Sequence, residues 1–258
     1  MAETASDDLA TMLAIGATAS VAQFVVHELV GHGSACALVG GRILAIAPLW
    51  MRCSVADRLM VLAGPMANLL AGAVCWALLS VFPPRSPAVR LFLWLSIAFQ
   101  WLVAAGYLAV GAASGFGDWL VIIPALRSWP ARLVGLAVAA GAYLLALRAL
   151  ARLGVKRLGV TFVTEPRLTR AGLFPALAAA AVSVLAEIVG GRFQPLGLAL
   201  AVGCTAVVGW SLLALPRFAS RATEGSESLV VRRSLGWILA GTATAVAFIA
   251  LVGPAIGS

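Results

Sequence analysis

The chain has 258 residues, of which 62% are hydrophobic and only 11% charged, with a formal net charge of +8. Because a soluble domain is roughly half apolar and one quarter charged, this composition excludes an ordinary soluble fold. The basic residues lie at the ends of apolar runs, where anionic lipid headgroups and the positive-inside bias account for them, so we expect no nucleic-acid partner.

Apolar runs long enough to cross a bilayer, which takes about 20 residues, recur along the chain. Two shorter runs can be lengthened by a flanking arginine that reaches the interface. We therefore expect an all-α polytopic membrane protein with six or seven transmembrane helices. The long runs cover residues 9–26, 59–84, 91–117, 193–216 and 234–258, and the shorter ones cover residues 133–147 and 171–186.

The four cysteines are Cys36, Cys53, Cys75 and Cys204, which lie within or beside apolar segments. They contain no C-x-x-C pair, so the sequence indicates neither a disulfide framework nor a zinc ribbon. We expect all four to be small packing residues.

Both histidines of the chain lie in the stretch "VVHELVGHGS", with Glu28 directly after His27. Ionisable residues at membrane depth are costly and are therefore candidate functional residues. In H-E-x-x-H, positions i and i+4 share one helix face and can bind one zinc ion, while the glutamate acts as a base. Here the spacing is H-E-x-x-x-H, which turns the two histidines about 140° apart on a straight α-helix.

A π-bulge around Val30 and Gly31 would absorb the extra residue and bring His27 and His32 back to one side. An alternative needs no bulge: Glu28, His32 and Cys36 are spaced i, i+4, i+8 along one helix face and could ligate a metal without His27.

Two later motifs bear on this choice. The stretch "LAGPMANLLAG" covers residues 62–72, and "GYLAVGAASGFGDW" covers residues 106–119. With the H-E segment before them, they resemble the site-2 protease family of intramembrane zinc metalloproteases, over roughly residues 9–125. The chain departs from that family in its extra residue and in lacking an asparagine-proline pair before the aspartate.

The resemblance implies that His27, His32 and Asp118 bind Zn2+, that Glu28 is the catalytic base, and that Asn68 is a polar group for the substrate backbone or the tetrahedral intermediate. It implies a three-helix protease core in residues 1–125, with additional transmembrane helices of unassigned role in residues 126–258. The substrate would be a transmembrane protein or peptide, cleaved by a multi-pass protease of a bacterial cell membrane.

The segment "GGRILAIAPLWMRCS", residues 40–54, alternates partly and favours a small β-hairpin beside the site. The family's arrangement would place the N-terminus outside and the metal site towards the cytoplasm. Against this, the connection over residues 148–170 carries six basic residues and would then lie outside as well, contrary to the positive-inside rule.

Two other functions are compatible with the sequence. An inactive pseudoprotease or membrane scaffold would bind metal or a partner without hydrolysis. A transporter is the weaker alternative, because transporters spread polar residues along a path, whereas here they are concentrated at one place.

Overall fold

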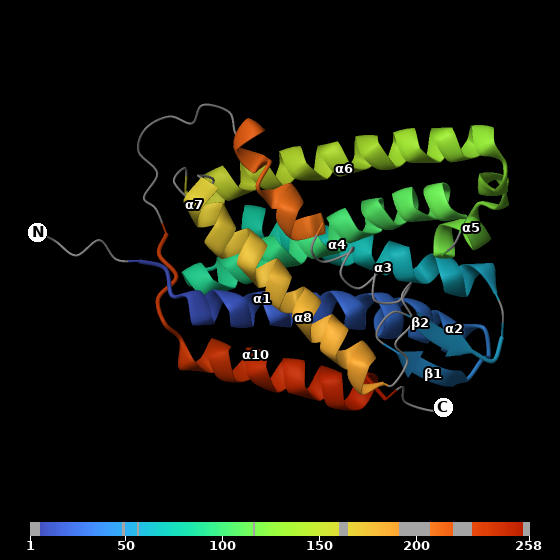
Figure 1. The fold of residues 1–258 in the computed structure, drawn as a ribbon, viewed down its shortest axis with the longest axis horizontal. Helices are drawn as coiled ribbons and strands as arrows, with labels where there is room; N and C mark the ends of the chain where they lie inside the picture. The colour runs from blue at the N-terminus through green and yellow to red at the C-terminus, as the bar shows by residue number, and fades with distance from the viewer. Residues whose placement is uncertain are drawn as a thin grey trace, which may run out of the picture.

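The structure is a computed structural model that describes residues 6–47, 50–55, 57–115, 117–159, 165–190, 207–218 and 229–254. Within these residues six helices are long and apolar enough to cross a membrane, as expected for a multi-pass membrane protein. Most of them run along one long axis, and α8 crosses the others obliquely (Figure 1).

The helices follow the apolar runs of the sequence, except that most of the run at 193–216 lies outside the described residues; residues 207–217 form a shorter apolar helix. The first span consists of α1 (Leu9–Phe24), η1 (Val25–Gly33) and α2 (Ser34–Leu38). The next three spans are α3 (Arg58–Val81), α4 (Pro87–Ser114) and α6 (Trp129–Leu158). The fifth span consists of α7 (Glu165–Leu168), η4 (Thr169–Leu173) and α8 (Phe174–Val189), and the sixth consists of α10 (Leu235–Ala247) and η6 (Phe248–Val252). Short elements are α5 (Asp118–Ile122), η2 (Pro124–Arg127) and η5 (Leu215–Arg217).

Polar side chains fix where several spans begin. Asp8, Asp57, Ser86 and Ser234 each precede a helix and accept a hydrogen bond from a backbone N–H of its first turn. Such N-caps satisfy amide groups that have no partner within the helix. The apolar runs therefore begin as helices close to the positions that their hydropathy indicates.

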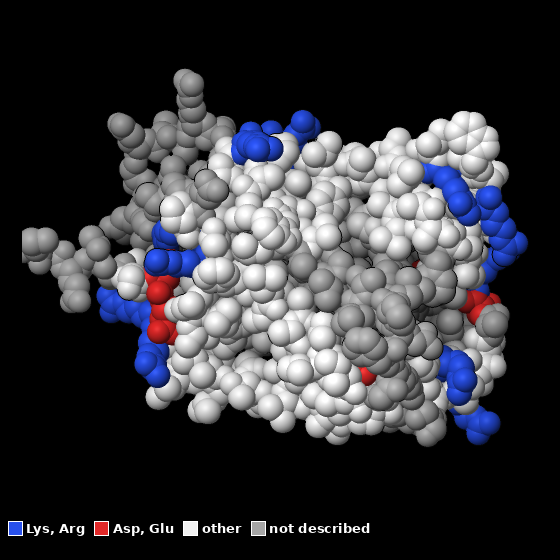
Figure 2. All heavy atoms as spheres, in the orientation of Figure 1, with Lys and Arg blue, Asp and Glu red and all other residues white. Residues whose placement is uncertain are grey.

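Helix α4 is the most buried span, and α1, α3 and α6 pack against it. Trp94 and Phe99 of α4 are fully buried in the main core. On the other side of α1 lie α8 and α10. On the face drawn in Figure 2, Lys and Arg side chains lie at the two ends and at one place along the upper edge, and most of the surface between the ends is neither basic nor acidic.

The first span is not a continuous α-helix, which confirms the widened turn expected from the histidine spacing. Residues Val25–Gly33 form a π-helix, and the amide of Ser34 donates to the carbonyl of Leu29, five residues earlier. The hydroxyl of Ser34 donates to the Val30 carbonyl, with the Gly31 carbonyl 3.3 Å away. At membrane depth freed carbonyls need such partners, because no bulk water reaches them.

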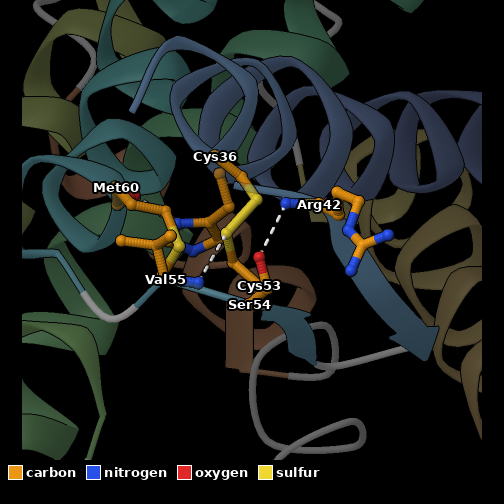
Figure 3. The surroundings of a disulfide bond; sticks show 7 residues. Cys36, Arg42, Cys53, Ser54, Val55 and Met60 are labelled. Carbon is orange, nitrogen blue, oxygen red and sulfur yellow. Dashed lines mark hydrogen bonds between the residues drawn. A yellow bond between two sulfur atoms is a disulfide. The ribbon is translucent and has the colours of Figure 1, made fainter. Parts of the chain in front are cut away.

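The expected hairpin is present as β1 (Ile43–Ala47) and β2 (Trp50–Cys53), paired antiparallel. Our expectation for the cysteines was wrong for two of them, because Cys36 of α2 and Cys53 of β2 form a disulfide (Figure 3). Cys75 is a free thiol, and Cys204 lies outside the described residues. The disulfide ties the hairpin to the end of the first span.

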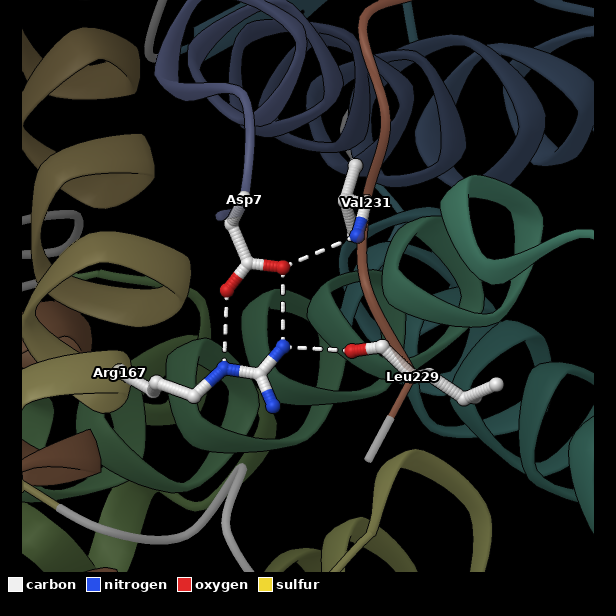
Figure 4. Close-up of polar contacts among 4 residues, drawn as sticks. All are labelled: Asp7, Arg167, Leu229 and Val231. Carbon is white, nitrogen blue, oxygen red and sulfur yellow. Dashed lines mark hydrogen bonds and ion pairs between the residues drawn. The ribbon is translucent and has the colours of Figure 1, made fainter. Parts of the chain in front are cut away.

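At the opposite end of the bundle, Asp7 and Arg167 form a bidentate ion pair with N···O distances of 2.8 and 2.9 Å (Figure 4). The Asp7 carboxylate also accepts from the amide of Val231, and Arg167 donates to the carbonyl of Leu229. We call this network the latch. It joins the segment before α1, helix α7 and the segment before α10. We refer to the two ends of the molecule as the latch end and the hairpin end.

Close packing of α1 against α8 depends on Gly16. A Cβ at this position would lie 2.6 Å from the Cα of Pro175. We expect Gly16→Ala to lower the free energy of unfolding by about 1–3 kcal/mol, as overpacking does, measured by thermal unfolding in detergent. Gly141→Ala is the control, since a Cβ there meets nothing within 4 Å. Equal stability of the two variants would contradict the close packing.

Candidate metal centre

Three elements bring the polar residues of the first half together at the hairpin end (Figure 1). The π-helix η1 carries His27 and His32, α5 begins with Asp118, and α3 packs against both. Two glycines make the turn from α4 into α5 possible: Gly115 and Gly117 have φ angles of 69° and 97°, which side chains rarely tolerate. The glycines of "GFGDW" thus direct Asp118 back towards η1.

The three side chains converge on one point. The distances from Asp118 Oδ2 are 3.3 Å to His27 Nε2 and 3.5 Å to His32 Nε2. One ligand atom from each residue lies within 4.8 Å of the others, so the group could hold a metal ion. Burial raises the pKa of the Asp118 carboxyl, but its contacts with the two imidazoles outweigh this and lower the pKa to about 2.

Each imidazole is also held through its other nitrogen. His32 Nδ1 lies 2.8 Å from the carbonyl oxygen of Met60. Because a carbonyl only accepts, Nδ1 must carry a proton, so Nε2 is the nitrogen that a neutral His32 can offer to a metal. A backbone carbonyl in this position is the usual way to orient a metal-binding histidine.

The side-chain amide of Asn68 orients His27 in the same way, through its Nδ1 atom. Its side-chain amide is fully buried and lies 3.1 Å from His27 Nδ1, while its Oδ1 atom has no hydrogen-bond partner among the described residues. The two ends of an amide differ only in hydrogen bonding, so the amide can be turned to place Oδ1 on Nδ1–H. In that orientation His27 Nε2 is free to bind metal. The role towards the substrate that the sequence predicts for Asn68 stays a prediction, and in the structure its amide lies against His27.

Gly64 of α3 lies directly against the two imidazoles, where any side chain would occupy the space between the candidate ligands. A Cβ at Gly64 would lie 3.0 Å from His27 Nε2 and 2.5 Å from His32 Cε1. Nearby, a Cβ at Gly31 would lie 2.6 Å from the Cα of Gly64, so the backbones of η1 and α3 are almost in contact. Glycine at both positions is therefore required by the site.

Glu28 is buried beside the three candidate ligands. Its side chain is 5% exposed, and Oε2 has no hydrogen-bond partner within the described part of the chain. A buried carboxylate oxygen without a partner is costly, and a functional role can explain it. The Oδ2 atom of Asp118 has no neighbour of this kind among the described residues other than the two imidazole nitrogens. The donor set therefore fits a cation.

The alternative ligand set is not assembled. Cys36 is bonded to Cys53, so no thiolate is available from it to accompany Glu28 and His32. Sequence reasoning missed the Met60 carbonyl and the steric role of Gly64. The glycine-proline pair gave a signal for Gly64, but a backbone carbonyl leaves none in the sequence.

Filling the space at Gly64 tests the metal centre. We expect Gly64→Ala to abolish metal binding, because the added methyl group occupies space next to both Nε2 atoms. Metal content of the purified protein measures this. Gly106→Ala is the matched control, since the nearest atom to a Cβ there is 3.8 Å away. Full metal content in Gly64→Ala would argue against this site.

The proposed contact of Asn68 makes a second prediction. Asn68→Asp keeps an acceptor for His27 Nδ1–H and should retain metal, whereas Asn68→Leu should lower the affinity by about 10–100-fold, as the loss of such partners does. Competition with a chromogenic chelator measures the affinity. Equal affinities in the two variants would show that Asn68 does not orient His27.

Comparison of the chain with models of protein families, with curated proteins and with solved structures finds no match. The resemblance described above therefore depends on its three motifs.

Proposed function

We propose that this chain is an intramembrane zinc metalloprotease of a bacterial cell membrane that hydrolyses peptide bonds of transmembrane substrates. One observation carries the proposal: two histidines and an aspartate converge, and a buried glutamate follows the first histidine on the same widened turn. All of them lie in or directly beside membrane-spanning helices.

The donor set favours zinc. Two imidazoles and one carboxylate are a ligand set of catalytic zinc sites, which keep a fourth position open. Carboxylate-rich sites built only from oxygen would instead favour magnesium or calcium. When bound, the ion would supply a Lewis acid that polarises the scissile carbonyl and acidifies a water molecule.

Glu28 would serve as the general base and then as the acid. It takes a proton from the attacking water, whose oxygen bonds to the carbonyl carbon of the substrate. The carbon–nitrogen bond then breaks, and Glu28 returns the proton to the leaving amine. The Oε2 atom of Glu28, which has no hydrogen-bond partner among the described residues, is suited to such transfer because no competing donor holds it.

The hairpin would present the substrate. A helical peptide hides its carbonyl groups in internal hydrogen bonds, so it must be extended before hydrolysis. Among the described residues β1 and β2 pair only with each other, and β2 packs against η1. An extended peptide could add to this small sheet as a further strand next to the metal centre.

Replacing Glu28 tests whether the chain is an active protease or an inactive metal-binding protein. We expect Glu28→Gln to abolish hydrolysis while bound zinc remains, because the variant loses a base and no ligand. The assay uses a single-span test protein with a helix-destabilising proline-glycine pair, mixed with the enzyme in detergent micelles, and mass spectrometry identifies fragments. Zinc is measured on the same samples.

Glu187→Gln is the control, because it neutralises another buried carboxylate, on α8, and should leave cleavage unchanged. Loss of zinc from Glu28→Gln would make Glu28 a ligand. A wild-type protein that binds zinc and cleaves nothing would be a pseudoprotease. A wild-type protein without bound metal would overturn the proposal.

A further inference from the structure

The two ends of the bundle differ in their basic residues. Two contacts between segments far apart in sequence show that further connections lie at the latch end. Arg90 donates to the carbonyl of Arg157, and the amide of Leu229 donates to the carbonyl of Leu158. The connections at this end are those between α3 and α4, between α6 and α8, and before α10. The basic residues of these connections and of the adjoining helix ends are Arg85 and Arg90, then Lys156, Arg157, Arg167 and Arg170, then Arg232 and Arg233, whereas Arg148 and Arg152 lie further inside α6.

The hairpin end carries fewer among the described residues: Arg42, Arg52, Arg58, Arg127 and Arg132. Short loops with an excess of lysine and arginine remain in the cytoplasm, and this bias sets the orientation of a multi-pass protein. The charge distribution therefore places the latch end in the cytoplasm and the hairpin end on the opposite side.

The disulfide is an independent observation that leads to the same orientation. Cys36 and Cys53 lie at the hairpin end, where their bond joins α2 to β2 (Figure 3). Thiols in the cytosol are kept reduced, and lasting disulfides belong to oxidising compartments. A structural disulfide four residues after His32 is therefore expected only if this end faces away from the cytosol.

We infer that the hairpin end, with the metal centre, faces an oxidising compartment outside the cytoplasm, and that the N-terminus lies in the cytoplasm. This orientation is the reverse of the one implied by the family resemblance. If the chain is the protease proposed above, this orientation also defines its substrate class. The substrates are transmembrane proteins whose susceptible bond lies near the extracytoplasmic boundary of the membrane. The hairpin can engage only segments that reach that side.

Two matched cysteine variants test the orientation without changing any charge. Ser86 precedes α4 at the latch end and Ser128 precedes α6 at the hairpin end, and both are exposed. Ser86→Cys and Ser128→Cys are each introduced into a chain carrying Cys75→Ala and Cys204→Ala. A membrane-impermeant maleimide is then applied to right-side-out and to inverted membrane vesicles.

We expect complete labelling of Ser128→Cys in right-side-out vesicles and none in inverted ones, with the reverse result for Ser86→Cys. Cys36 and Cys53 should resist alkylation until a reductant is added. Labelling with the opposite sidedness, labelling of one variant in both kinds of vesicle, or free Cys36 and Cys53 thiols would each overturn the inference.

A pair of test substrates distinguishes this inference from the proposed function. The same single-span protein carries its proline-glycine pair near either the extracytoplasmic or the cytoplasmic end of its helix. We expect cleavage only of the first. Cleavage only of the second would overturn the inference. Cleavage of neither, with the expected labelling, would refute the protease activity and uphold the orientation.

Discussion

The candidate metal centre depends on how closely the backbones of η1 and α3 approach each other. Gly31 and Gly64 face each other without side chains, so the two helices nearly touch at this level. Van der Waals packing between small residues is the main source of helix association in lipid, where no hydrophobic effect favours it. From this contact the carbonyl of Met60 and the amide of Asn68, on α3, reach the imidazoles of η1.

The widened turn of η1 is the second feature that brings the two imidazoles together. A regular helix through His32 would aim one imidazole away from α3, whereas the π-helix aims both towards it. Ser34 accommodates the change by donating to the Val30 carbonyl. The departure from α-helical geometry is thus local and leaves α1 free to pack against α4, α8 and α10.

Much of this could be predicted from the sequence because it follows from periodicity and spacing. Hydropathy alone marked the six described spans, and the interval between His27 and His32 predicted a wider turn if both residues bind one ion. The hairpin followed from a short alternating stretch. Asp118 was found only through its motif, since its approach to the histidines depends on the turn at Gly115 and Gly117.

Other features leave no such signal. Cys36 and Cys53 are 17 residues apart, and their pairing depends on β2 folding back against the end of the first span. Asn68 was recognised as polar and important, but its partner was not, because side-chain direction depends on how α3 rotates against η1. The grouping of basic connections at one end became clear only when the path of each span was known.

The latch has a consequence for how the protein is made. Asp7 and Val231 are 224 residues apart in the chain, and α1 packs against α8 and α10, which are synthesised last. At roughly 5–20 residues per second, the first span waits about 11–45 s in the membrane before its last neighbour emerges from the ribosome. Before α10 emerges, η1 can already contact α3 and β2, which come earlier in the chain. The time for which α1 lacks its late neighbours α8 and α10 therefore depends on the speed of translation.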